Sequence, residues 1–109
     1  MSFHTNASNI RVDDGHMLRA RLRNTNGDEV DSELDLNSCI GNTSGRFEWG
    51  SKNFAESAEG IYFSVEGDAQ VPILRARLRG ADQSADQSFD ADVNLAERIG
   101  NDNGRLYFS

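Results

Sequence analysis

Hydrophobic and polar residues alternate with a period of two along much of the chain. In residues 18–23 (LRARLR) leucine or alanine alternates with arginine, and after the turn signal Asn26-Gly27 residues 30–36 alternate again. A period of two places every second side chain on the same face of a β-strand. No segment keeps an apolar stripe at helical spacing over three turns. The pattern therefore predicts an all-β protein in which these two segments form a β-hairpin.

Two similar halves make up the chain. The string LRARLR returns unchanged at residues 74–79, and IGNTSGR at residues 40–46 returns as IGNDNGR at residues 99–105. Repeat 1 therefore covers about residues 1–50 and repeat 2 about residues 51–109. A half of about 50 residues buries too little apolar surface to hold a core alone. We expect one domain of 109 residues that contains both repeats.

Each half is predicted to end in a second, shorter hairpin. The chain would turn at residues 42–45 in repeat 1 and at residues 101–104 in repeat 2, with hydrophobic residues on both sides of each turn. Repeat 2 is longer because of insertions before Leu74 and before Phe89. Pro72 lies in the first insertion and is the one residue expected to be able to break a strand.

The charged residues of the predicted hairpins fall into complementary rows. The arginines of residues 19–23 would lie beside the acids of residues 31–35. Those of residues 75–79 would lie beside Asp90 and Asp92. Cross-strand pairs of opposite charge contribute roughly 0.2–1 kcal/mol each. We therefore expect the LRARLR strings to be neutralised in place rather than to form a phosphate-binding patch.

The overall charge excludes whole classes of partner. The chain has 18 acidic and 11 basic residues, for a net charge of -7, which disfavours binding to the polyanionic surfaces of nucleic acids and membranes. No stretch approaches the roughly 20 apolar residues that span a bilayer, and the polar start MSFHTNAS does not resemble a signal peptide. We expect a cytoplasmic protein that binds neither nucleic acid nor membrane.

Residues able to carry catalysis or to hold a metal are few. Cys39 is the single cysteine, which excludes an internal disulfide and a zinc site of several thiolates, and it is expected to be packed. His4 and His16 have no evident partnered nucleophile and are expected at the surface. The NDNG string at residues 101–104 lacks the ligand spacing of an EF-hand loop. We expect no enzyme, no metal and no cofactor.

Four strings resemble a known lectin family. They are TNG at residues 25–27, DLNS at 35–38, IGN at 40–42 and WGSKNFAES at 49–57. In their order, spacing and repetition they are similar to the cyanovirin-N homolog (CVNH) family, and to its fungal members in particular. The resemblance implies that each repeat supplies a three-stranded sheet and a hairpin that packs on the other repeat. It also implies binding of mannose-rich glycans with terminal α1-2-linked mannose, without catalysis or metal.

One departure from the family concerns disulfides. The lectin that gives the family its name carries a disulfide in each repeat, and the matching positions here are Ala7 with Leu22 and Ala58 with Leu78. Apolar pairs in place of both bridges suit a reducing compartment. Fungal members of the family also lack these bridges, so the departure implies a cytoplasmic protein with the same fold.

The resemblance implies two carbohydrate sites, one near each end of the molecule. Short polar side chains and backbone amides around tight turns can replace the water partners of sugar hydroxyls. The site that we call the terminal site comprises Ser2, Thr5, Asn6, Arg23, Thr25, Asn101, Asp102 and Asn103. The site that we call the central site comprises Asn42, Ser44, Lys52, Asn53, Glu56, Ser57, Arg79 and the loop that follows Arg79.

The two sites depart unequally from the family pattern. In the central site Gly41 stands where the family has a carboxylate, Ser44 replaces another acid, and residues 80–88 are lengthened. In the terminal site Arg23 replaces an acid and Asn103 replaces an aspartate. We therefore favour the terminal site as the better one.

Structural explanations compete with binding for several of these residues. Asn42 and Asn101 would also be expected simply to close hairpin turns, because asparagine tolerates positive φ. Trp49 and Phe108 occupy equivalent positions and are expected in the core rather than as platforms for sugar rings.

Three classes of function follow from the sequence. A non-catalytic lectin for mannose oligosaccharides is the first, and a protein-interaction module with decayed sugar sites is the alternative. A hydrolase would need paired carboxylates in a cleft, and most acids already face arginines. The junction at residues 49–52 lacks the proline of the family's exchangeable hinge, so we expect a monomer with at most a minor domain-swapped dimer.

Overall fold

The computed structural model describes residues 3, 7–68, 70–80 and 88–109, and its regular structure is made of strands and short 3-10 turns. No α-helix occurs in these ranges, so the predicted all-β class is confirmed. The strands are β1 (Ala7–Asp13), β2 (Met17–Arg23), β3 (Glu29–Asp35), β4 (Ile40–Thr43), β5 (Arg46–Trp49), β6 (Ala58–Glu66), β7 (Val71–Arg79), β8 (Ser88–Asn94), β9 (Ile99–Asp102) and β10 (Arg105–Phe108). The 3-10 turns are η2 (Leu36–Ser38), η3 (Phe54–Ser57) and η4 (Leu95–Glu97).

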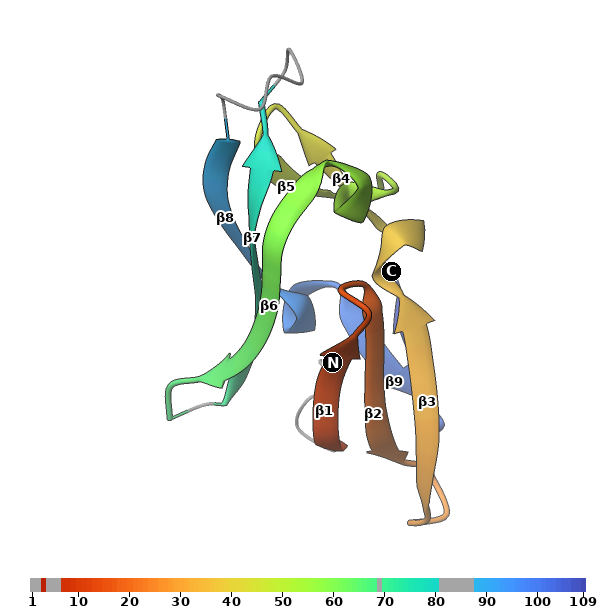
Figure 1. The fold of residues 1–109 in the computed structure, drawn as a ribbon. Helices are drawn as coiled ribbons and strands as arrows, with labels where there is room; N and C mark the ends of the chain where they lie inside the picture. The colour runs from red at the N-terminus through yellow and green to blue at the C-terminus, as the bar shows by residue number, and fades with distance from the viewer. Residues whose placement is uncertain (1–2, 4–6, 69, 81–87) are drawn as a thin grey trace.

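The strands form two antiparallel three-stranded sheets and two hairpins. One sheet has the order β1-β2-β3 and the other β6-β7-β8, and the hairpins are β4–β5 and β9–β10. Each hairpin packs on the sheet of the opposite repeat: β5 contacts β8, and β10 contacts β3. The two sheets lie at opposite ends of an elongated molecule of 50 × 26 × 22 Å (Figure 1). The exchange of hairpins that the family resemblance implies is therefore confirmed.

The core is built from equivalent residues of the two repeats. In β2 the leucines and the alanine point inward and the arginines outward, as the alternation predicts. Leu18 and Leu22 are fully buried, and so are Leu74 and Leu78 of the matching strand β7. Further buried pairs are Ala20 with Ala76, Leu36 with Leu95, Ile40 with Ile99, and Phe3 with Phe54. Most of these residues belong to one continuous cluster, so the packing of each repeat depends on the other.

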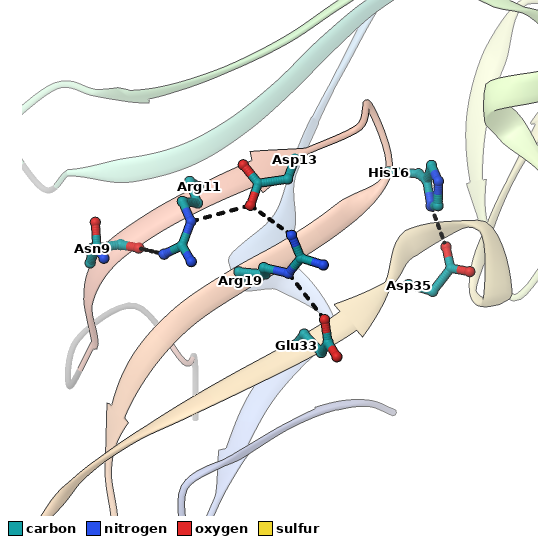
Figure 2. A network of polar contacts seen from close by, with 7 residues as sticks. All are labelled: Asn9, Arg11, Asp13, His16, Arg19, Glu33 and Asp35. Carbon is teal, nitrogen blue, oxygen red and sulfur yellow. Dashed lines mark hydrogen bonds and ion pairs between the residues drawn. The ribbon is translucent and has the colours of Figure 1, made fainter.

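The 3-10 turns direct the chain from each sheet into the following hairpin. The side chain of Asp35 accepts a hydrogen bond from Asn37 N and thereby caps η2, and Asn94 caps η4 in the same way through Ala96 N. Asp35 also contacts His16, whose Nδ1 lies 2.8 Å from Asp35 Oδ1 (Figure 2). His16 is about one third exposed, in agreement with its predicted surface position. His4 lies outside the described residues.

The first insertion of repeat 2 lengthens a hairpin instead of breaking a strand. Strands β6 and β7 have 9 residues each, against 7 each in β1 and β2. Pro72 lies inside β7, where it pairs with Val65 of β6. The pairing of β7 with β8 begins at the next residue, Ile73. Proline lacks an N–H group, and here it occupies a segment that pairs with one neighbouring strand only. The prediction that Pro72 could break a strand was therefore wrong.

Apolar pairs occupy the positions that match the disulfides of the family. Ala7 is the cross-strand partner of Leu22, and Ala58 is that of Leu78. Both leucines are fully buried and both alanines pack against the core. Cys39 is buried, and burial raises the pKa of its thiol to about 11. Cys39 is 2% exposed and belongs to the core cluster, which confirms that it is packed.

Candidate functional site

An ion-pair network covers the outer face of the sheet β1-β2-β3 (Figure 2). Arg19 donates from Nη1 to Asp13 Oδ2 at 2.9 Å and from Nε to Glu33 Oε2 at 3.0 Å. Arg11 donates from Nε to the same oxygen of Asp13 at 3.2 Å and from Nη1 to the carbonyl of Asn9 at 3.1 Å. The hydrogen bond from Arg19 holds the pKa of Asp13 below its usual value. These charges neutralise one another within the face.

The matching face of the sheet β6-β7-β8 follows the same scheme. Arg75 pairs with Asp92 across the strands at 3.3 Å, and Arg77 lies 3.6 Å from Asp90. Both registers agree with the predicted rows. Arg75 gains a further partner, Glu66, whose Oε1 lies 2.5 Å from Nη2 and whose pKa is lowered by this contact. Glu66 belongs to the lengthened hairpin, and the sequence pattern did not predict this contact.

We expect duplex DNA to show no saturable binding to this protein at physiological salt. Arg19, Arg21, Arg75 and Arg77 already pair with carboxylates across the strands. The net charge of -7 also repels the phosphate backbone. Fluorescence anisotropy with a labelled duplex tests this expectation. The Arg75→Gln/Arg77→Gln variant should behave as the unmodified protein does. Tight, salt-sensitive binding that this variant loses would show that the rows are not neutralised.

The terminal site lies where the turn of the β9–β10 hairpin meets the β2–β3 turn. Asn101 Nδ2 donates to the carbonyl of Arg23 at 3.0 Å, and Asn101 Oδ1 accepts from Gly104 N at 2.8 Å. Thr25 donates to Asn103 Oδ1 from its backbone N at 3.0 Å and from Oγ1 at 2.9 Å. These residues and Asn24 line an open cavity of about 260 Å³. The cavity is lined by the amides of the three asparagines, the hydroxyl of Thr25 and the side chain of Arg23.

The central site has the same construction at the β4–β5 turn. Asn42 Nδ2 donates to Ser57 Oγ at 2.8 Å and to the carbonyl of Arg79 at 3.0 Å. Asn42 Oδ1 accepts from Gly45 N at 2.9 Å. Asn42 therefore fastens its own turn and also ties the hairpin to repeat 2, as Asn101 ties the other hairpin to repeat 1.

Both turns place two successive residues in the left-handed region. Ser44 and Gly45 have φ of 52° and 89°, and Asn103 and Gly104 have φ of 51° and 90°. Positive φ at both central residues is typical of type I′ hairpin turns, whose twist matches that of the strands. Asn42 and Asn101 do close these turns, as expected, through side-chain bonds to the glycines. The expected reason was wrong, because the positive φ values belong to the two residues at the centre of each turn and not to Asn42 or Asn101.

The two asparagines differ in what they leave for a ligand. Both amide hydrogens of Asn42 are used within the protein, so its Oδ1 alone keeps hydrogen-bonding capacity. Within the described part of the chain Asn101 uses one amide hydrogen, so it keeps one donor and one acceptor site. The terminal site is therefore better equipped for a hydroxyl, which needs both kinds of partner.

The other predicted residues are placed as follows. Asp102 is exposed on β9 beside the terminal site, and Lys52, Glu56 and Ser44 are exposed around the central site. Asn53 has a φ of 65° and pairs with Gly41 in an isolated bridge, which holds the junction between the repeats against β4. Ser2, Thr5, Asn6 and the loop 81–87 lie outside the described residues.

Two residues near the sites are absent from the prediction. Asn24 lines the terminal cavity, and its Oδ1 accepts from Asn26 N and Asp28 N at 3.0 Å each, which shapes the turn that carries Thr25. Its position directly before Thr25 was the available signal. Phe89 packs on Gly45 beside the central site. An alignment of the strands that follow the two LRARLR strings would have shown that Phe89 is the equivalent of Val30.

The two aromatic residues at the ends of the short hairpins pack together. The rings of Trp49 and Phe108 are stacked with centroids 5.7 Å apart and an interplanar angle of 12°. The guanidinium of Arg98 lies 5.4 Å from the Phe108 centroid, and Trp49 Nε1 lies 3.4 Å from Glu97 Oε1. Both rings also contact the core. The prediction that they pack rather than serve as open platforms is confirmed.

Neither a metal cluster nor a membrane-spanning helix was found in the parts of the chain that can be described. No group of three His, Cys, Asp or Glu residues there could hold an ion. No helix there is long and apolar enough to cross a membrane.

Two polar clusters built around an asparagine amide, repeated at opposite ends of a pseudo-symmetric all-β framework, are the arrangement of a carbohydrate-binding lectin that performs no catalysis. The chain belongs to the cyanovirin-N homolog family, because the CVNH domain model matches residues 3–107. Members of this family are non-catalytic carbohydrate-binding proteins.

Similar proteins cover nearly the whole chain. A cyanovirin-N homolog from Neurospora crassa is 45% identical over 110 residues, which are 97% of this chain and 96% of the relative. The NMR structure of a designed cyanovirin-N homolog lectin is 49% identical and has a TM-score of 0.91 over 100% of both chains. The microvirin:mannobiose complex has a TM-score of 0.84 over 99% of this chain and 98% of microvirin. At 24% identity it shows the fold alone.

Proposed function

We propose that this lectin binds mannose-rich glycans through terminal α1-2-linked mannose, and that the terminal site binds more tightly than the central one. The observation that carries the proposal is that, among the residues that the structure describes, Asn101 keeps one donor and one acceptor site beside the Thr25 hydroxyl. A mannose hydroxyl both donates and accepts, so this pair can replace the water partners it gives up. The family resemblance supplies the preference for mannose.

The geometry of the terminal site favours a small, neutral ligand. Asn103 Oδ1 already accepts two hydrogen bonds from Thr25, so the two turns are held together before a ligand arrives. A preformed site avoids the entropic cost of ordering its walls. Each site is nevertheless expected to bind weakly, because a sugar exchanges hydrogen bonds with water for hydrogen bonds with protein and gains little apolar burial.

An NMR titration with α1-2 mannobiose tests the proposal. We expect the largest amide shifts at Thr25 and Asn101, followed by smaller ones at Asn42 and Asn53. A mannobiose is also the sugar in the solved microvirin:mannobiose complex, so a disaccharide of mannose is a practical first probe. No shift at any of these residues at millimolar sugar would contradict the lectin proposal and would favour a protein-interaction module with decayed sugar sites.

Replacing Thr25 by alanine should weaken binding at the terminal site about tenfold while the fold is kept. The hydroxyl is lost, but the backbone N of residue 25 still donates to Asn103 Oδ1, so the two turns stay connected. Titration calorimetry with mannobiose and urea unfolding measure the two effects. Thr43→Ala serves as the matched control. It removes an exposed hydroxyl from the β4–β5 hairpin, where the Thr43 hydroxyl donates to Glu48. Equal affinity of both variants would move the proposal to the central site.

Substitution of Asn101 is a poorer test of binding. Its side chain ties the β9–β10 hairpin to Arg23 and to its own turn, so alanine there would remove structure together with the contact. A Thr25→Ala/Asn101→Ala variant is expected to lose terminal binding, but the loss is informative only where unfolding curves show the folded state.

A further inference from the structure

The aromatic ring of Phe89 lies exposed beside the central site. Phe89 is the second residue of β8, pairs with the buried Leu78, and is 50% exposed. Its side chain packs on Gly45 so closely that a Cβ added to that glycine would lie 3.0 Å from Phe89 Cγ. Tyr62 and Tyr107 are exposed as well, so exposure alone does not single out Phe89; its distinguishing feature is that it packs on the turn whose glycine binds Asn42.

The equivalent contact at the other end of the molecule uses a smaller residue. Val30 pairs with Leu22 as Phe89 pairs with Leu78. Val30 packs on Gly104, where an added Cβ would lie 2.5 Å from Val30 Cγ2. Valine is therefore sufficient for docking a hairpin turn on the edge strand. The ring of Phe89 adds apolar surface that this docking does not require.

The β4–β5 turn contacts both the Phe89 ring and the polar residues of the central site. Gly45, on which the ring packs, donates its N–H to Asn42 Oδ1. Asn42 in turn donates to the carbonyl of Arg79, the residue that follows Leu78 in β7. Arg79 Nε is also buried, with no hydrogen-bond partner in the described part of the chain. The partly exposed Phe89 side chain therefore lies against the turn in which Asn42 Oδ1 keeps acceptor capacity.

We propose that Phe89 is a stacking platform for a sugar ring in the central site, and that it gives this site a different selectivity from the terminal site. The inference rests on the proposed sugar binding. The axial C–H bonds at C3 and C5 of mannopyranose point to one face of the ring, and they carry partial positive charge. The face of an aromatic ring is negative and attracts such groups. Val30 offers no such face, so the terminal site recognises sugar by hydrogen bonds alone.

Reciprocal exchange of the two residues tests the platform. Phe89→Val copies the terminal arrangement into the central site, and we expect about fivefold weaker mannobiose binding there with unchanged binding at Thr25 and Asn101. Phe89→Tyr keeps the aromatic face and should keep the affinity. Val30→Phe should strengthen binding at the terminal site. Shifts of the backbone amides report each site separately.

A spectroscopic readout separates stacking from a merely structural role. A sugar ring above Phe89 experiences the ring current, so the H3 and H5 protons of bound mannobiose should move upfield with the unmodified protein and with Phe89→Tyr. They should not do so at the central site of Phe89→Val. Central binding that is equal in Phe89 and Phe89→Val, or mannobiose shifts confined to the terminal site, would overturn the platform and leave the lectin proposal standing. Absence of binding at both sites would overturn both.

Discussion

Replacing Asn42 by alanine should lower the free energy of unfolding by about 2–4 kcal/mol. The side chain makes three hydrogen bonds, two of which cross from the β4–β5 hairpin to Ser57 and Arg79 of repeat 2. Each hydrogen bond contributes roughly 0.5–1.5 kcal/mol net, and a partner left unpaired in a partly buried place adds to the loss. Urea unfolding followed by tryptophan fluorescence measures the change, because Trp49 lies at the end of the same hairpin.

Asn101→Ala is the natural comparison for this variant. Asn101 makes two such bonds instead of three, so its loss should be smaller, about 1–3 kcal/mol. Thr43→Ala, at an exposed position of the same strand as Asn42, should change stability by less than about 0.5 kcal/mol. If the Asn42→Ala variant were as stable as the Thr43→Ala variant, the hydrogen bonds of the Asn42 amide would not be what holds the β4–β5 hairpin to repeat 2.

This expectation changes how binding data on the asparagines are interpreted. A loss of sugar binding in Asn42→Ala would follow from a displaced turn as readily as from a missing contact. Thr25 and Phe89 separate binding from folding better, because the backbone N of residue 25 keeps the bond to Asn103 when the hydroxyl is removed, and Phe89 is half exposed. The two candidate sites are thus built on side chains whose first role is to hold the repeats together.

The strands and the arginine rows were predictable because they depend on local pattern. Alternation of leucine and arginine in β2 and β7 needs no knowledge of distant residues, since the inward face of a strand is fixed by its period of two. That the arginines of β7 lie beside the acids of β8 also follows, because both rows alternate with the inward-facing residues of neighbouring strands. The exchange of hairpins between repeats came from family resemblance, since period and spacing carry no information on it.

The details of the sites were not predictable in this way. The ties from Asn42 to Arg79 and from Asn101 to Arg23 join residues far apart in sequence and involve a backbone carbonyl, which the residue type does not reveal. The exposure of Phe89 depends on which hairpin packs against β8. The place of Pro72 within β7 depends on where β8 ends. Each of these features is set by tertiary packing.

The close packing around Gly41 excludes a side chain at the position where the family resemblance implies a carboxylate. A Cβ at this buried position would lie 2.5 Å from Ser51 Cβ and 2.8 Å from Lys52 N, in the segment that joins the repeats. The same segment is held against β4 by the bridge between Gly41 and Asn53. Gly50 begins the junction at a φ of 85°, which lets the chain fold back at little steric cost. A side chain at position 41 would therefore clash with the junction in its folded-back conformation.

Gly41→Asp, which restores the family carboxylate, should therefore destabilise the monomer by about 3 kcal/mol or more and should not improve sugar binding. The clash disappears when the junction opens and the halves exchange between two chains, so we expect the variant to shift from monomer toward a dimer of about twice 12.0 kDa. The unmodified protein should remain a monomer at micromolar concentration, helped by its net charge of -7. Sedimentation velocity and urea unfolding measure both quantities.

Two further variants isolate the cause of this shift. Gly50→Ala strains the backbone at positive φ but meets no atom within 4 Å, so it should lower stability without the same shift toward dimer. Ser51→Gly removes the side-chain atoms nearest to the added Cβ, and combined with Gly41→Ala it should recover part of the lost stability. Ser51→Pro should also raise the dimer fraction, because proline restricts the folded-back junction. A Gly41→Asp protein that stays monomeric and fully stable would show that the junction yields to the side chain, and steric exclusion would then not account for Gly41.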